Sequence, residues 1–83
     1  MKLTAEITLY PLQDYYLDII KATIDQINTY TGVEVSTVPT ATIMVGEYED
    51  VMRVINDIVA WSFEKYGKCV FVTKFIPGYN AFE

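Results

Sequence analysis

The residues best suited to ligand chemistry lie near the N-terminus, where Tyr10, Asp14, Tyr15 and Tyr16 place three phenol rings and a carboxylate within seven positions. Aromatic faces beside a carboxylate suit a flat ring that carries an amino group or a positive charge. The structural alternative is that Asp14 caps a helix and Tyr16 belongs to the core. A second carboxylate, Glu6, could accept hydrogen bonds from an amine or an aminopyrimidine edge.

Glu6 also has a structural interpretation. It falls on a predicted central strand, where a carboxylate is costly unless it is paired. Lys74 falls on the predicted last strand, which should run antiparallel beside the first, so the two side chains could form a cross-strand ion pair. Trp61 is open to two interpretations as well, because it fits the core face of a helix and could also stack on a ligand ring.

Groups for catalysis are scarce. The 83-residue chain contains no histidine, which removes histidine metal ligands, the usual neutral-pH general base and the Ser-His-Asp and Cys-His mechanisms. Cys69 is the only cysteine, so neither an internal disulfide nor a thiolate zinc cluster can form. Glu47, Glu49 and Asp50 are interpreted as the solvated start of a helix. We therefore expect no enzyme activity, no cofactor and no metal site.

The charge balance limits the partners. Six basic and eleven acidic residues give a net charge of −5, which disfavours nucleic acid and anionic membrane surfaces. Apolar residues make up 52% of the chain, but no uninterrupted run approaches the length of a membrane span. The first six residues, Met-Lys-Leu-Thr-Ala-Glu, do not resemble a signal peptide. We expect a cytoplasmic protein with no nucleic-acid partner and no membrane insertion.

Hydrophobic periodicity predicts six elements. Alternating or continuous apolar residues predict four strands, over residues 2–10, 33–37, 41–45 and 69–76. Helical spacing predicts two helices, over 13–30 and 47–66. The apolar stripe of the first helix contains Tyr16, Ile20, Ile24, Ile27 and Tyr30, and it is widened by Ile19 and Thr23.

The order β-α-β-β-α-β predicts a single α+β domain over residues 1–83 with a loose tail from about residue 78. Right-handed crossovers place the first and third strands at the centre of a four-stranded antiparallel sheet, with both helices on one face. This is the ferredoxin-like sandwich.

The other face of this sheet should lack a covering layer. On the first strand Thr4, Glu6, Thr8 and Tyr10 should line it. On the last strand the set is either Val70, Val72, Lys74 and Ile76 or Cys69, Phe71, Thr73 and Phe75. Either set leaves apolar groups uncovered, which predicts association with a second copy as a homodimer or a dimer of dimers.

Three segments carry a family resemblance: AEITLYPLQDYY (5–16), TVPTATIMVGEYEDVM (37–52) and YGKCVFVTKFIPG (66–78). Together they resemble the YkoF-like family of thiamine- and hydroxymethylpyrimidine-binding domains, within the thiamine-binding-protein superfamily. The resemblance implies a ferredoxin-like, non-enzymatic domain that pairs through its sheet and binds thiamine or its pyrimidine precursor.

The resemblance also implies site residues. Tyr10, Pro11 and Asp14 match the family's Tyr-Pro-x-x-Asp, and Thr37 and Thr42 fall on threonines of its second and third strands. Two positions depart from the family pattern: Val38 replaces a frequent Asp or Asn, and Ala41 replaces a frequent Ser. Both changes remove hydrogen-bonding groups from the implied pocket wall, which would weaken binding or change the ligand.

The sequence therefore predicts a homo-oligomer that binds a small aromatic molecule, most specifically thiamine or its hydroxymethylpyrimidine moiety. The candidate ligand-binding residues are Glu6, Tyr10, Asp14, Thr37, Thr42 and Trp61. The alternative is a ligand-free assembly or regulatory module that oligomerises through its sheet face.

Overall fold

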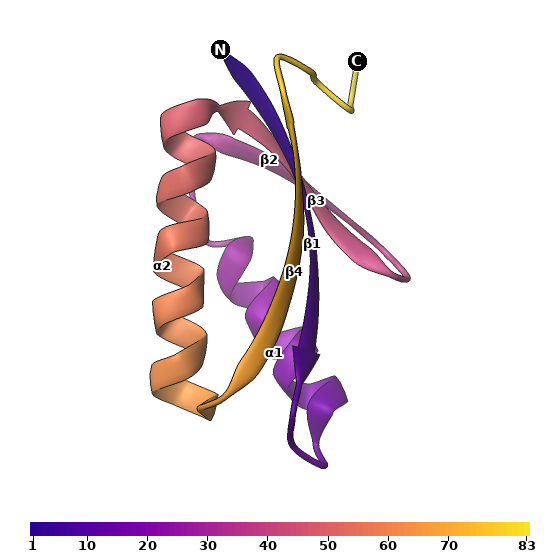
Figure 1. Cartoon of the computed structure of the whole chain (residues 1–83), viewed down its shortest axis with the longest axis vertical. Coiled ribbons are helices and arrows are strands. Elements are labelled where there is room, and N and C mark those ends of the chain that lie inside the picture. Colours follow the sequence, from indigo (N-terminus) through magenta and orange to yellow (C-terminus); the bar gives the residue numbers. More distant parts are fainter.

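The computed structural model describes residues 1–83 and has the predicted element order. The strands are β1 (Lys2–Pro11), β2 (Val33–Val38), β3 (Ala41–Glu47) and β4 (Cys69–Pro77), and the helices are α1 (Tyr16–Ile27) and α2 (Tyr48–Tyr66). All four strands pair antiparallel in the order β2-β3-β1-β4, with β1 and β3 at the centre. Figure 1 shows both helices on one side of the sheet. The predicted ferredoxin-like α+β sandwich is confirmed.

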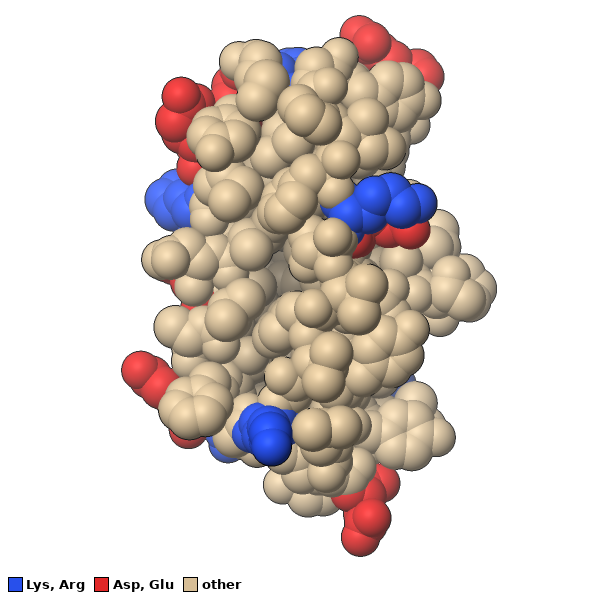
Figure 2. All heavy atoms as spheres, in the orientation of Figure 1, with Lys and Arg blue, Asp and Glu red and all other residues tan.

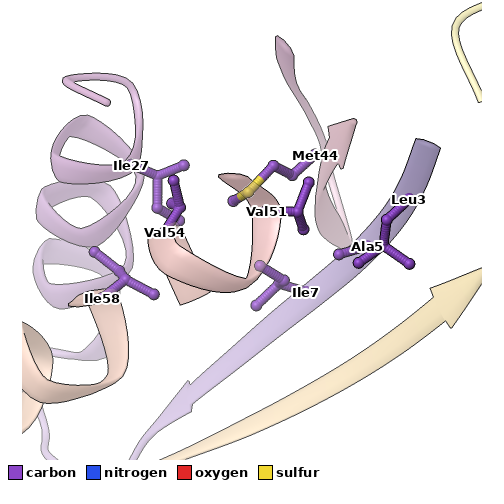
Figure 3. Packing of buried hydrophobic residues seen from close by; sticks show 8 residues of the cluster. All are labelled: Leu3, Ala5, Ile7, Ile27, Met44, Val51, Val54 and Ile58. Atoms are coloured by element: carbon purple, nitrogen blue, oxygen red, sulfur yellow. The ribbon is translucent and has the colours of Figure 1, made fainter. Parts of the chain in front are cut away.

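The core fills the layer between sheet and helices (Figure 3). Alternation along β1 turns every second side chain toward the helices, as expected for a pleated strand. The helices contribute apolar residues that are spaced three or four positions apart. The eight buried residues of the cluster are Leu3, Ala5 and Ile7 of β1, Ile27 of α1, Met44 of β3, and Val51, Val54 and Ile58 of α2.

We call the uncovered side of the sheet the open face. The β1–β4 register settles which half of β4 lies there, because Glu6 stands opposite Lys74 and Thr8 opposite Val72. The predicted cross-strand pair is confirmed, with Lys74 Nζ 3.6 Å from Glu6 Oε1. Both groups remain solvated, so the pair contributes only about 0.2–1 kcal/mol. The open face carries Thr4, Glu6, Thr8 and Tyr10 from β1 and Val70, Val72, Lys74 and Ile76 from β4.

Figure 2 shows, in the orientation of Figure 1, that charged side chains lie mostly around the outline of the molecule and that uncharged atoms fill most of the view. Neither helix is long and apolar enough to cross a membrane.

Helix α1 is shorter than predicted. It begins at Tyr16 with Tyr15 as its N-cap, which makes no side-chain capping hydrogen bond, so the prediction that Asp14 caps this helix is wrong. Asp14 lies one residue too early, in the turn that follows Pro11. The helix also ends at Ile27 rather than near residue 30, because the side chains of Asn28 and Thr29 bond to helix carbonyl groups and stop its propagation.

The segment after Gly78, expected to be a loose tail, is bound to the sheet. Thr4 lies on the open face, and its Oγ1 donates to the carbonyl oxygen of Tyr79 (2.7 Å) and accepts from the backbone N–H of Ala81 (3.1 Å). The backbone N–H of Gly78 also donates to the carbonyl oxygen of Lys2 (2.7 Å). These bonds bury Thr4, so the chain covers one end of its own open face. Figure 1 shows this segment on the side of the sheet away from α2.

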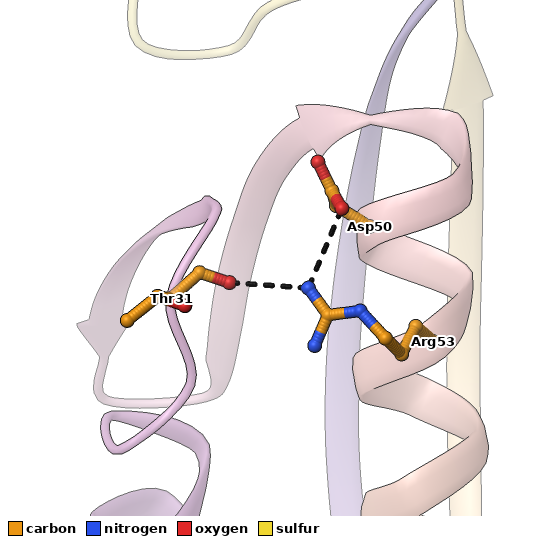
Figure 4. Close-up of polar contacts among 3 residues, drawn as sticks. All are labelled: Thr31, Asp50 and Arg53. Carbon is orange, nitrogen blue, oxygen red and sulfur yellow. Dashed lines mark hydrogen bonds and ion pairs between the residues drawn. The ribbon is translucent and has the colours of Figure 1, made fainter.

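Arg53 joins α2 to the connection before β2 (Figure 4). Its Nη2 donates to the carbonyl oxygen of Thr31 (3.2 Å) and to Asp50 Oδ1 (3.4 Å). The ion pair is half exposed, so its main effect is to fix the position of the Thr31–Gly32 turn against the helix start.

Gly46 is required by the packing of β2 against β3. A Cβ at this position would lie 2.9 Å from the carbonyl oxygen of Gly32 and 3.1 Å from Val33 Cγ1. We expect Gly46→Ala to destabilise the fold by about 1–3 kcal/mol, because backbone must move to admit the methyl group. Denaturant unfolding at fixed protein concentration measures this effect. The control is Ser36→Ala on an exposed position of β2, which should change stability by less than about 0.5 kcal/mol. Equal stabilities of the two variants would contradict the prediction.

Candidate functional site

The two central strands separate before they end. Pairing between β1 and β3 runs from Lys2↔Glu47 to Ile7↔Thr42 and stops there. Beyond that point β1 continues to Pro11 paired only with β4, while β3 pairs only with β2 as far as Val38↔Ala41. Figure 1 shows the turn of the β2–β3 hairpin pointing away from β1. The sheet is therefore split at this end.

A cavity of about 560 Å³ lies at this split and extends under α1. Its walls come from the end of β1, from α1, from the β2–β3 hairpin and from Phe71 of β4. None of the lining residues is charged, and most are hydrophobic. Such a mixture of apolar walls and few polar groups is typical of small-molecule sites.

Thr37 and Thr42 supply hydroxyl groups to the cavity. They stand opposite each other across β2 and β3, with their Oγ1 atoms 3.4 Å apart. Each hydroxyl can donate one hydrogen bond and accept two, so this single long contact leaves most of their capacity free. Thr23 also lines the cavity, but its Oγ1 already donates to the carbonyl oxygen of Ile19 (2.8 Å). Thr42 is buried and Thr37 is exposed, and together they are the main polar feature of the wall formed by β2 and β3.

Aromatic rings form another part of the lining. Tyr10 comes from the end of β1 and Tyr16 from the first turn of α1, and both are about half exposed. Phe71 approaches from β4. Rings in these positions can cover a flat ligand, and the tyrosine hydroxyls can reach solvent or ligand.

The structure brings together three of the six candidate residues: Tyr10, Thr37 and Thr42 line the cavity. Glu6 lies on the open face beside Lys74 and outside the lining. Asp14 is exposed in the turn before α1 and also lies outside it.

Trp61 lies on α2, away from the cavity lining. Its ring packs edge-on against Tyr66, with centroids 5.9 Å apart, and Lys65 Nζ lies 5.1 Å from its centroid. It also packs against the core cluster.

Sequence reasoning missed the part that α1 plays in the site. The most buried residues of α1 are Ile19, Thr23 and Ile27. Thr23 and Ile27 also border the cavity, and the less buried Ile20 and Ile24, which share the predicted apolar stripe with Tyr16, line it as well. The width of the apolar stripe on this helix could have indicated the cavity. A helix that only packs against the core needs a narrower apolar face.

A hydrogen bond spans the split in the sheet. Thr8 Oγ1, on the open face of β1, donates to the carbonyl oxygen of Thr40 in the hairpin turn (3.0 Å). This bond ties the turn to β1 beyond the last backbone pair of the ladder. Thr8 and Thr40 both line the cavity, so the bond lies at its border.

Cys69 lies elsewhere, beside a smaller groove of about 250 Å³ between the end of α2 and β4. Desolvation by burial raises the pKa of the Cys69 thiol above its ordinary value. A raised pKa lowers the fraction of thiolate, which is the nucleophilic form. Cys69 therefore acts as a small apolar residue of the fold.

The fold and site define a small ferredoxin-like domain with one uncharged cavity at the end of its sheet. The profile of the YKOF-related family matches residues 2–75, and this chain belongs to that family. None of the curated proteins compared with the chain matches it.

Solved structures with the same fold are similar over nearly the whole chain. Protein SP2199 of Streptococcus pneumoniae has a TM-score of 0.86 at 21% identity, covering 95% of this chain and 89% of its own. A Thermotoga maritima protein provisionally assigned to thiamine biosynthesis or salvage has a TM-score of 0.83 at 20% identity, covering 98% and 86%. The hypothetical protein MJ1052 of Methanocaldococcus jannascii has a TM-score of 0.78 at 17% identity, covering 95% and 82%. At these identities the likeness establishes the fold.

The raised pKa of Cys69 predicts slow alkylation. At pH 8 we expect iodoacetamide to modify the native chain more slowly than the same chain unfolded in urea, because burial keeps the thiol protonated. The native rate should rise with pH and reach half of its maximum above the ordinary pKa of cysteine. Mass spectrometry of quenched samples measures both rates. Equal rates for native and unfolded chains at pH 8 would contradict the assignment.

Proposed function

We propose that this chain binds a small flat aromatic molecule of the thiamine type without transforming it, and that the hydroxymethylpyrimidine moiety is the part bound in the cavity. The observation that carries the proposal is the uncharged cavity under α1, with the hydroxyls of the buried Thr42 and the exposed Thr37 on the wall formed by β2 and β3. Membership of the YKOF-related family and the likeness to the Thermotoga maritima protein support the ligand class.

Size and shape support the proposal. A volume of about 560 Å³ lies within the range of small-molecule sites, roughly 300–1,000 Å³. A substituted pyrimidine fits this volume with room for its hydroxymethyl and amino groups. Tyr10, Tyr16 and Phe71 supply the aromatic surface that such a ring would stack on.

Hydrogen-bonding chemistry supports the same class. An aminopyrimidine carries an amine donor and ring-nitrogen acceptors, and a hydroxymethyl group both donates and accepts. Threonine hydroxyls serve donors and acceptors alike, so Thr37 and Thr42 can match either edge of the ring. Val38 and Ala41 also line the cavity, so the polar groups absent at these positions reduce the number of hydrogen bonds available to a ligand.

The uncharged lining suits one ring of thiamine better than the other. The thiazolium ring is a cation, and the nearby carboxylates of Glu6 and Asp14 both lie outside the lining. Burying a charge without a partner is costly, so the neutral pyrimidine suits the cavity and the thiazolium suits its solvent side. We include in the proposal that the binder is a homo-oligomer formed through the open face.

The threonine pair gives a direct test. We expect hydroxymethylpyrimidine to bind saturably in calorimetric titration, and Thr37→Val and Thr42→Val each to weaken binding about twofold to tenfold, the equivalent of one neutral hydrogen bond of roughly 0.5–1.5 kcal/mol. Valine preserves the side-chain shape. The control is Thr29→Val, which lies outside the lining and should bind like the wild-type chain.

A wild-type chain that gives no heat and no thermal stabilisation in a large excess of hydroxymethylpyrimidine or thiamine would refute the proposal. An oligomer with that result would favour the ligand-free assembly module instead.

Phosphorylation of the ligand should abolish its affinity. No lysine or arginine lines the cavity, and the chain carries a net charge of −5, so a phosphate group would lose water without gaining a cationic partner. We expect the phosphate ester of hydroxymethylpyrimidine to bind at least about 100-fold more weakly than the free alcohol. This factor corresponds to a loss of roughly 3 kcal/mol of binding free energy. Competition calorimetry measures the ratio. Comparable affinities would show that the hydroxymethyl group lies outside the cavity or that an anion site exists.

A further inference from the structure

The cavity crosses the full width of the sheet. Its lining includes Thr37 from β2, Thr42 from β3, Ile7 and Leu9 from β1, and Phe71 from β4. Residues opposite each other in a ladder share a face, and Leu9 lies two positions from the core residue Ile7, so all five lie on the helix side. In the order β2-β3-β1-β4, strand spacings of about 4.8 Å place β2 and β4 roughly 14 Å apart.

The threonine hydroxyls that remain available lie at the β2–β3 end of the cavity. The Thr37–Thr42 contact is long and leaves both hydroxyls with free capacity. Thr8 already donates to the carbonyl oxygen of Thr40 (3.0 Å), and Thr23 donates to a carbonyl oxygen of its own helix (2.8 Å). A ligand inside the cavity therefore finds most of its polar partners at this end.

The β1–β4 end of the cavity is apolar. Its sheet side consists of Leu9 and Phe71, which stand opposite each other. Helix α1 starts just beyond the end of β1 and runs back along the sheet, so Ile20, near the helix start, lies toward this end (Figure 1). We call Leu9, Ile20 and Phe71 the apolar end. Their side chains offer no hydrogen bond, and a hollow of this kind holds water poorly, so a hydrocarbon group is stabilised by filling it.

The substituents of hydroxymethylpyrimidine match this polarity. Its amino and hydroxymethyl groups occupy neighbouring ring carbons, and its methyl group lies on the carbon across the ring from the hydroxymethyl group. When the polar edge of the ring meets Thr37 and Thr42, the methyl group points toward the apolar end. A single six-membered ring with a methyl group is too short to reach across the roughly 14 Å between β2 and β4, so the apolar end stays unfilled.

We propose that the apolar end binds a hydrocarbon arm of the ligand, longer than a methyl group and placed across the ring from the hydrogen-bonding edge. This inference rests on the proposed function, because it concerns the same cavity, and it specifies the ligand class: a neutral heteroaromatic ring with polar groups on one edge and an apolar arm on the other. Leu9, Ile20 and Phe71 then determine specificity for the arm, while Thr37 and Thr42 bind the ring.

A series of ligands tests the arm directly. In the analogues, ethyl or propyl replaces the methyl group of hydroxymethylpyrimidine, and calorimetric titration measures each affinity. We expect each added methylene to tighten binding to the wild-type chain about threefold to fourfold, so the propyl analogue should bind about tenfold more tightly than hydroxymethylpyrimidine. The matched control ligand carries a methoxymethyl group, which has the length of propyl. It should bind no more tightly than hydroxymethylpyrimidine, because its ether oxygen would lose water without finding a donor.

Variants locate the arm. The readout is the ratio of the two affinities, for the propyl analogue and for hydroxymethylpyrimidine, so that a general effect on the cavity cancels. Ile20→Phe places a larger side chain in the apolar end and should reduce the ratio from about tenfold to about twofold or less. Thr37→Val should weaken both ligands and leave the ratio near tenfold, because it changes only the polar end.

The matched control is Val59→Phe on α2, which is 44% exposed and lies outside the cavity lining. Its ratio should equal that of the wild-type chain. Circular dichroism checks the folding of each variant, and Phe71→Trp replaces Ile20→Phe if the latter does not fold.

The outcomes separate this inference from the proposed function. If the wild-type chain binds hydroxymethylpyrimidine saturably but binds the propyl analogue no more tightly, the arm is refuted and the proposed function stands. A methoxymethyl analogue as tight as the propyl analogue would refute the apolar character of this end. An unchanged ratio in Ile20→Phe would place the arm elsewhere and overturn the assignment. A chain that binds neither thiamine nor any member of the series would refute the proposed function and this inference together.

Discussion

The central strands β1 and β3 pair as far as Ile7 and Thr42 and then separate, each remaining paired to its outer neighbour. A ladder that continued to the strand ends would bring the hairpin turn against Tyr10 and leave no space under the first turns of α1. The separation instead creates a cavity whose inner wall is the Thr37–Thr42 pair and whose outer border is the Thr8–Thr40 bond. The position of this separation thus determines both the site and the part of the open face that adjoins it.

The distribution of charge agrees with this geometry. The acidic excess lies outside the cavity, and on the open face Lys2 pairs with Glu47 and Glu6 with Lys74, while Glu34 of β2 adds a carboxylate without an ion-pair partner. An uncharged cavity in an acidic chain admits a neutral ring and opposes an anion, first by long-range repulsion and then by desolvation. Selectivity against phosphorylated compounds therefore needs no dedicated residue.

Periodicity was sufficient for the fold and for the faces of the strands. Alternation in β1 assigned Leu3 and Ile7 to the core and Glu6 to the open face, and right-handed crossovers placed β1 beside β4, which led to the Glu6–Lys74 pair. The cavity could not be predicted in this way. The hairpin turn at Pro39 and Thr40 ends β3 one residue beyond its last pair with β1, and this turn does not by itself predict that a cavity forms beside it.

The same limit applies to individual site residues. Asp14 has the side chain of a helix cap, but the backbone reaches helical geometry only at Tyr16, so position in the turn overrides residue type. Thr37 and Thr42 were selected through family resemblance, and Tyr10 through its aromatic ring as well. Their common location depends on the positions of the hairpin and the end of β1 in space. Residue type can propose members of a site, whereas tertiary geometry decides which of them meet.

Helix α1 connects the site to the stability of the whole domain. Ile19, Thr23 and Ile27 are the buried residues of the helix, and Thr23 and Ile27 also border the cavity. The less buried Ile20 and Ile24 line the cavity and lack part of the packing that a filled core provides. A bound ring would supply that missing contact. A chain of 83 residues buries a modest fraction of its surface and has a small free energy of unfolding. Such added contacts would therefore be a substantial part of that free energy. The bound ring and the core would then contact the same helix, so the stability of the domain should rise with the occupancy of its cavity.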